Sequence, residues 1–142
     1  MTLKRIANRD ARDYVARRQP FHGSNLMAEK YNDGTLYVVY SFGTHHPLFV
    51  FDENAGQWYE NMTYASRTTS KHRTQCRPNG EDIIPLCLND MKFVEQHGAV
   101  GVIMAADARQ EADDIRESAV KLMQGINGTI AASYITNPLW GV

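Results

Sequence analysis

The chain has few of the residues that cross-link or tether a small protein. It holds two cysteines and five prolines in 142 residues, and its apolar runs are far shorter than the roughly 20 residues that span a bilayer. Cys76 and Cys87 are eleven positions apart, a spacing that fits neither a CxxC motif nor a zinc ribbon. Two cysteines also exclude a disulfide-stapled miniprotein. We therefore predict two free thiols, with Cys87 in the core, and no membrane partner.

Net charge is nearly absent as well. Fifteen Lys and Arg oppose sixteen Asp and Glu, and 43% apolar with 22% charged residues is close to the globular average. This composition excludes a disordered tail and a collagen-like fibre. The first ten residues lack the apolar core of a signal peptide, which favours a reducing compartment. The length fits one domain, and no repeat or linker divides it, so we predict a single domain over 1–142.

The balanced total hides a segregation of charge along the chain. Residues 1–20 carry a net charge of +4 and residues 61–80 another +4, whereas 21–60 carry −4 and 81–142 carry −5. If the two basic segments meet on one face, they form an anion-binding surface in spite of the acidic total. The alternative is that they neutralise the acidic segments within the molecule or across a dimer.

Local patterns predict an α+β fold. β-branched and aromatic residues at 35–42, 48–51 and 57–61 alternate with turn signals, which favours an antiparallel meander over about 24–61. A regular apolar stripe predicts a long helix at 104–124 that ends at Gly125 and packs with the sheet. Shorter elements are expected as helices at 8–18, 71–76 and 91–97, a linker or edge strand at 83–88 and a closing strand at 129–136.

The stripe of the long helix is unusually rich in alanine. Its members follow each other at intervals of 3 and 4 over three heptads: Ala105, Ala108, Ala112, Ile115, Ala119, Leu122 and Ile126. Alanine at inner positions allows close approach of another backbone. One interpretation places this helix across the sheet of its own domain. The other pairs it antiparallel with a second copy, and this pattern predicts a homo-oligomer, most simply a dimer.

The second basic segment, 66–77, is the strongest candidate for a binding site. It combines hydroxyls suited to capping a helix, with Thr68, Thr69 or Ser70 as the expected cap, and cations suited to holding phosphate. The predicted anion- or nucleic-acid-binding residues are Arg67, Thr68, Thr69, Ser70, Lys71, His72, Arg73 and Arg77. A solvated surface helix has the same composition, so both interpretations stay open.

Signals for catalysis, metals and cofactors are weak. The five histidines lack the spacing of a metal-binding helix, and no phosphate-cradling glycine loop is present, so we predict no metal and no cofactor. His72, beside Arg73, suits a metal-independent ribonuclease. However, the segment contains no carboxylate to orient the imidazole. The ribonuclease is therefore the weakest of the functional interpretations.

Three blocks of the sequence carry a resemblance to a known family. They are YVVYSFGTHHPL at 37–48, WYEN at 58–61 and YASRTTSKH at 64–72. Together they resemble a family of small tailed-phage proteins without an assigned function, over roughly 20–78. Two differences stand out, because Phe42 replaces a tyrosine and Ala65 separates the Tyr and Ser of the third block.

The resemblance implies a phage origin and an accessory role in the host bacterial cytoplasm, and it brings no catalytic residues. The leading functional hypothesis is thus a non-enzymatic phage accessory protein that binds a host or phage macromolecule. A nucleic-acid-binding protein that uses the 66–77 segment is the main alternative.

Overall fold

The computed structural model describes residues 3–42, 46–63 and 65–136, with side chains up to residue 125 in the last helix. The chain divides into two compact units, Met1–Ala105 and Ala106–Val142. The first unit contains a sheet with helices on both faces. Within the described residues, the second unit continues the last helix.

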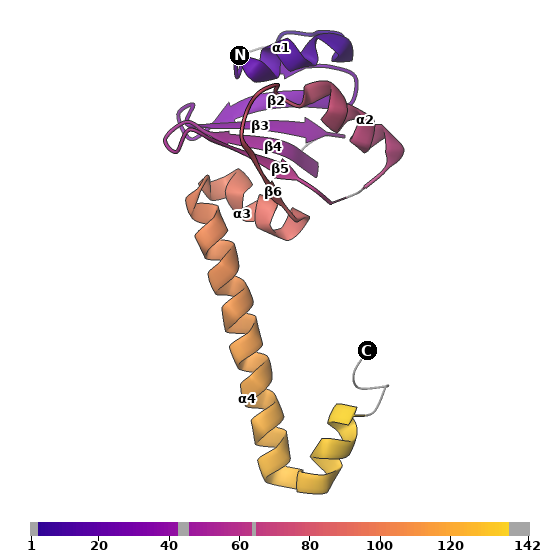
Figure 1. Cartoon of the computed structure of the whole chain (residues 1–142), viewed down its shortest axis with the longest axis vertical. Helices are drawn as coiled ribbons and strands as arrows, with labels where there is room; N and C mark the ends of the chain where they lie inside the picture. Colours follow the sequence, from indigo (N-terminus) through magenta and orange to yellow (C-terminus); the bar gives the residue numbers. More distant parts are fainter. Residues whose placement is uncertain (1–2, 43–45, 64, 137–142) are drawn as a thin grey trace. The chain divides into compact units, whose positions relative to one another are not determined.

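The sheet has six strands in sequence order (Figure 1). They are β1 (Phe21–His22), β2 (Leu26–Tyr31), β3 (Leu36–Ser41), β4 (His46–Asp52), β5 (Gln57–Asn61) and β6 (Ile83–Leu86). Neighbours from β1 to β5 are antiparallel, as short turns between strands require, and β6 adds a parallel edge to β5. The α+β class and the antiparallel meander predicted from the sequence are thus confirmed.

Strand β3 shows why these residues form the centre of the sheet. All six of its side chains are buried, so both faces of the sheet are covered there. Tyr37 lies on one face, in the cluster that holds Trp58, and Tyr40 lies on the other. The Trp58 ring meets Tyr37 and Phe49 edge-on, at centroid distances of 6.2 and 6.3 Å, an arrangement that aromatic pairs favour.

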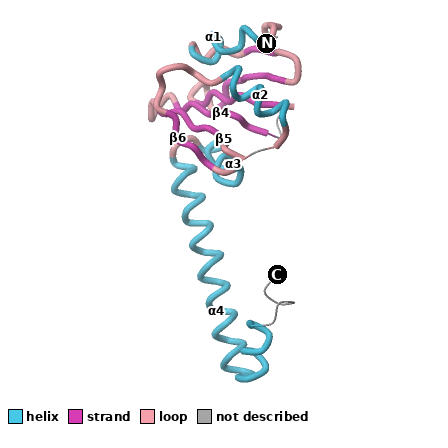
Figure 2. Tube along the Cα trace, turned by 45° about the vertical axis from the view of Figure 1, so that its right-hand side comes forward, coloured by secondary structure: helices cyan, strands magenta, loops and turns pink. Residues whose placement is uncertain are grey.

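Helices cover the two faces separately (Figure 2). The 3₁₀ helix η1 (Asn8–Asp10), α1 (Ala11–Ala16) and α2 (Arg67–Cys76) lie on the face of Trp58, where Val15 and Cys76 enter the core. On the other face, α3 (Leu88–His97) contributes Met91 and Val94. The first turn of α4 (Val100–Thr136) adds Val102 there.

Two expectations for the end of the chain are wrong. Helix α4 passes through Gly125, and residues 129–136, predicted as a closing strand, are helical. A glycine inside a helix costs only about 1 kcal/mol relative to alanine, so it does not stop a long helix by itself. A helix also satisfies its own backbone hydrogen bonds, whereas a closing strand needs a free sheet edge. Among the described residues, no helix is both long and apolar enough to cross a bilayer.

The two cysteines are free, as expected, but the prediction that Cys87 lies in the core is wrong. Cys76, the last residue of α2, is buried. Burial raises the pKa of its thiol to about 12, so the thiol stays protonated at neutral pH. Cys87 is exposed rather than in the core, because it caps α3 directly after the edge strand β6. Strand β6 itself is only partly buried.

A glycine fixes the turn between α3 and α4. Gly98 has φ +69° and ψ −148°, a conformation essentially restricted to glycine. The turn is tied to β4, since the Ala99 N–H donates to Asp52 Oδ2 over 2.8 Å. A Cβ on Gly98 would meet that same carboxylate oxygen and the Leu36 side chain. Gly98 therefore allows the close approach on which this contact depends.

We expect Gly98→Ala to lower the free energy of unfolding by about 1–3 kcal/mol, measured by urea denaturation, because the new methyl combines backbone strain with the clash. Gly56→Ala is the matched control. Its φ of +63° also favours glycine, but a Cβ there meets nothing within 4 Å. Equal losses in the two variants would show that the contact with Asp52 contributes nothing.

Candidate nucleic-acid interface

The two basic segments of the sequence meet on one face of the sheet. Helix α1 comes from the first segment and α2 from the second, and both pack on the core cluster around Trp58. Arg12 Nη2 donates a hydrogen bond of 2.7 Å to the Thr74 carbonyl oxygen, across 62 positions of sequence. The two basic segments therefore share one face of the molecule, which the sequence alone did not decide.

We call the surface formed by η1, α1 and α2, together with the cations that flank these helices in sequence, the basic layer. Its cations are Lys4, Arg5, Arg9, Arg12, Arg17, Arg18, Arg67, Lys71, Arg73 and Arg77. Its carboxylates are Asp10 and Asp13 in the same segments, and Glu53 and Glu60, which pair with Arg18 and with Arg73 and Arg77. Ten cations against four carboxylates leave a net charge of +6 on a chain whose total is −1.

The N-cap of helix α2 lies two to four positions before the caps expected from the sequence. The Ser66 hydroxyl accepts the Thr69 N–H over 3.1 Å, so Ser66 is the N-cap. The same hydroxyl also donates to Thr69 Oγ1 over 3.1 Å. Thr69 is consequently buried, Ser70 is half-buried and Thr68 is exposed. Of the three predicted hydroxyls, only Thr68 faces solvent freely.

His72 points inward from α2. It is 4% exposed, and its Nδ1 lies 2.7 Å from the Ser41 hydroxyl, which also lies 3.4 Å from the Thr69 hydroxyl. Burial lowers the pKa of His72 below its usual value, and the positive charge of Lys71 lowers it further. A largely neutral, buried and hydrogen-bonded imidazole suits a structural role better than the general base of a ribonuclease.

Glu60 holds the C-terminal half of α2. Its carboxylate, on β5, is 4% exposed and accepts hydrogen bonds from Arg77 Nη1. Arg73 Nε lies 3.7 Å from the same carboxylate, and Arg73 Nη1 donates to the Asn61 carbonyl oxygen over 3.1 Å. These two arginines are therefore engaged within the protein.

The eight predicted binding residues thus divide into two groups. Thr69, His72 and Arg73 attach α2 to the sheet, and Arg77, though half-exposed, pairs with Glu60. The outer group has a half-buried Ser70 and three exposed members, Arg67, Thr68 and Lys71.

Sequence reasoning missed three residues that define this surface: Ser41, Glu60 and Arg12. A signal existed for Glu60, because alternation in β5 places it on the same face as Trp58, where a carboxylate needs a cation. Alternation likewise places Ser41 on the face of Val39. Nothing local distinguishes Arg12 from its basic neighbours.

The predicted interface stripe lies in both units. Ala105 belongs to the first unit and is buried, whereas the other stripe residues with described side chains are exposed in the second. The exposed fractions reach 63% at Ile115 and 64% at Leu122. The side chain of Ile126 lies outside the described residues. Two ion pairs lie beside the stripe, Asp113–Arg116 at 3.5 Å and Glu117–Lys121 at 3.1 Å.

The opposite face of the sheet has a different character. A hollow of about 490 Å³ beside α3 is lined by Tyr31, Asn32, Tyr40, Lys92, Glu95 and Gln96. Burial raises the pKa of Tyr40, and hydrogen bonding to Glu95 raises it further. The Tyr31 hydroxyl donates to Glu29 over 2.9 Å. The hollow thus combines two phenol rings with one cation, Lys92, and one carboxylate, Glu95.

Two further observations concern metal binding and similarity to known proteins. In the part of the chain that the structure describes, no three His, Cys, Asp or Glu side chains gather as a metal site requires. No protein-family model matches the chain, and no curated protein or solved structure is significantly similar to it.

We expect the free energy of unfolding to decrease as the pH falls from 7 to 5. The pKa of His72 is lowered in the folded protein, so below the ordinary value near 6.5 the unfolded chain binds more protons than the folded one. In His72→Gln, which retains a polar group for Ser41, the decrease should be smaller. Urea denaturation across this pH range measures the difference.

His46 adds to the same dependence, since burial lowers its pKa too, and the positive charges of Lys92 and Arg73 lower it further. The double variant His46→Gln/His72→Gln should show the weakest pH dependence of the series. Identical slopes in the wild type and His72→Gln would contradict the buried, neutral state of His72.

Proposed function

We propose that this protein is a non-enzymatic binding protein whose macromolecular ligand is a nucleic acid, held on the basic layer. The observation that carries the proposal is the convergence of two basic segments, distant in sequence, on one face of the sheet. A single basic helix is common on protein surfaces. Two segments that join into one cationic surface on an acidic chain form an extended site for a polyanion.

The distribution of the remaining charge supports this choice of ligand. Outside the basic layer, five cations face twelve carboxylates, a net charge of −7. A ligand that carries phosphates is therefore oriented toward the basic layer and away from the rest of the chain. A protein partner whose surface carries charges of both signs would be attracted to the basic layer far less strongly.

Two kinds of cation have different roles in this proposal. Arg73 and Arg77, paired with Glu60, keep α2 in place. Arg67 and Lys71 are exposed on α2, and Arg9 and Arg17 are exposed on the first segment. The exposed cations contact phosphates. Contacts to the backbone carry no sequence information, so this binding is largely independent of sequence.

The resemblance to tailed-phage proteins supports a setting for this activity. A small phage accessory protein acts in the host bacterial cytoplasm, where its ligand is host or phage DNA or RNA. A host or phage protein as the partner is the competing outcome. A metal-independent ribonuclease is disfavoured by the burial of His72, and breakdown of the oligonucleotide during a binding assay would reveal it.

We expect Arg67→Ala/Lys71→Ala to weaken binding of DNA and RNA about tenfold or more at low salt, for all sequences alike. The slope of log K against log salt should fall by roughly 1.5, because two phosphate contacts and their released counterions are lost. Gel shift and fluorescence anisotropy with labelled oligonucleotides, from low to physiological salt, measure both quantities.

The control Arg109→Ala removes an exposed cation of the second unit and should leave the affinity unchanged. Light scattering verifies that each variant keeps the wild-type mass. Absence of any binding by the wild-type protein at low salt would refute the proposal and favour a protein partner, which a pull-down from host lysate would identify.

We further propose that α4 pairs with a second copy of the chain. Ile115 and Leu122 stay exposed within a stripe of alanines, and this apolar strip is covered when two helices pack. Both signs of charge flank the stripe, with Asp113 and Glu117 beside Arg116 and Lys121, which allows antiparallel pairing between identical helices.

Ala112→Glu should convert this dimer into a monomer, because it buries an unpaired carboxylate at a cost of several kcal/mol. Ala106→Glu makes the same chemical change one position outside the stripe and should leave the dimer intact. Light scattering at micromolar concentration measures the mass of each. A wild-type mass near the 16.1 kDa of one chain would refute the pairing.

A further inference from the structure

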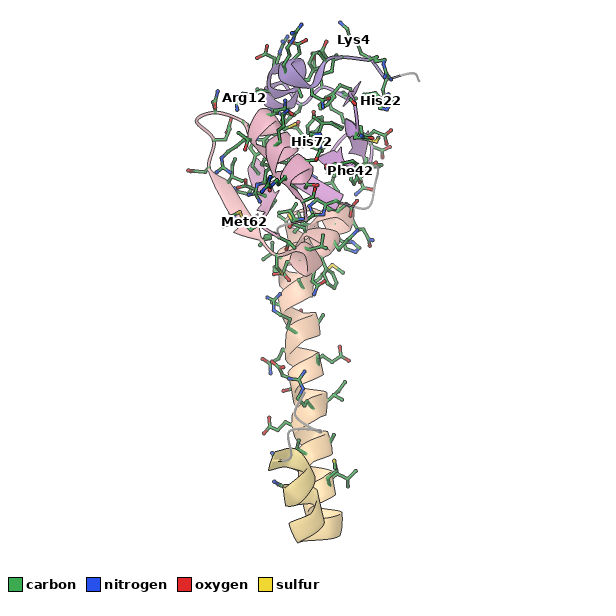
Figure 3. All side chains as sticks on the ribbon, turned by 90° about the vertical axis from the view of Figure 1, so that its right-hand side faces the viewer. Lys4, Arg12, His22, Phe42, Met62 and His72 are labelled. Atoms are coloured by element: carbon green, nitrogen blue, oxygen red, sulfur yellow. The ribbon has the colours of Figure 1, made fainter. Side chains whose placement is uncertain are left out.

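Phe42 is an exposed aromatic residue at the edge of the basic layer. It directly follows β3 and retains 46% of its surface open to solvent. Its ring lies beside His72 of α2, with the centroids 5.7 Å apart and the planes inclined by 43° (Figure 3). Phe42 thus places an open aromatic ring against the helix that carries Arg67 and Lys71.

The backbone at Phe42 is held in a costly conformation. Its φ of +57° lies in the left-handed region, which is uncommon for any residue other than glycine and a real outlier for a bulky one. The Phe42 N–H donates to the Asn25 carbonyl oxygen over 2.9 Å, which ties the residue to the loop before β2. Such strain persists only where surrounding contacts enforce it, and it is concentrated at functional sites.

The His72 ring, which contacts Phe42, is also held in place by its neighbours. His72 is anchored from below by Ser41, which ends β3 one residue before Phe42. The exposed Lys71 precedes His72 in α2, and the exposed Thr68 lies one helical turn earlier. The exposed ring of Phe42 therefore contacts a helix that also carries an exposed cation and an exposed hydroxyl.

We propose that Phe42 is a stacking platform for an unpaired base, so that the basic layer prefers single-stranded nucleic acid. The inference rests on the proposed function, because Lys71 and Arg67 hold the backbone whose base stacks on the ring. Proteins that bind single strands combine a cationic track with aromatic rings in this way. In a duplex the base faces are already stacked, so Phe42 has no surface to meet.

The experiment compares Phe42→Leu with the wild type by fluorescence anisotropy. The probes are 12-nucleotide mixed-sequence single strands of RNA and of DNA, and the matching DNA duplex. Leucine preserves an apolar side chain over His72 but removes the flat π-surface. Binding of the single strands should weaken about 5- to 150-fold, the range for loss of one stacked base, with an unchanged salt slope. Binding of the duplex should stay the same.

Two further variants separate stacking from structure. Phe42→Tyr keeps the ring and should bind single strands as the wild type does. Ile84→Ala shortens another exposed apolar side chain, on β6, and should have no effect on binding. Thermal melting verifies that every variant is folded. If Phe42→Leu does not fold, Phe42→Ser and Phe42→Tyr provide the comparison.

The outcomes distinguish this inference from the function beneath it. If the wild type binds no nucleic acid, both fail together. If binding depends on Arg67 and Lys71 while Phe42→Leu behaves as the wild type, only the stacking inference fails. Equal losses for single strands and duplex would also overturn it, because they indicate a general disturbance of the basic layer. A difference between the RNA and DNA single strands identifies the preferred polymer.

Discussion

The arrangement of the basic layer depends on one buried carboxylate. Glu60 lies on β5, on the same face as Trp58, where water cannot solvate it. A buried carboxylate is tolerated only when cations and hydrogen-bond donors compensate its lost hydration. Arg73 of α2 and Arg77, which directly follows the helix, provide that compensation, which requires α2 to lie over β5. The ion pairs therefore act as a constraint on where the helix can dock.

Once α2 is docked, its other contacts follow from the 3.6-residue period of the helix. Thr69, His72 and Cys76 share the inward side and meet the sheet. Arg67 and Lys71 lie on the outward side and remain exposed. The same charges that looked equivalent in sequence thus acquire two roles, as internal anchors and as external contacts.

Much of the sheet could be predicted from local pattern. The alternating aromatic and β-branched residues of β3 and the turn at Asn32–Gly34 define a meander before any long-range contact is known. The C-terminal region was harder. Residues 129–136 have the composition of a strand, yet they are helical, because local propensity is only a weak guide to secondary structure.

The sequence by itself determined the α+β class, the meander, the segregation of charge and the identity of the basic segment at 66–77. Only the tertiary structure decided that α1 and α2 share one face, through Arg12 and Thr74, and that Glu60 engages Arg73 and Arg77 in ion pairs. It also brought Phe42 beside His72. The physical reason is that propensity and alternation depend on residues close together in the chain. The partners of a buried charge, in contrast, are the residues that lie close to it in space, whatever their distance in sequence.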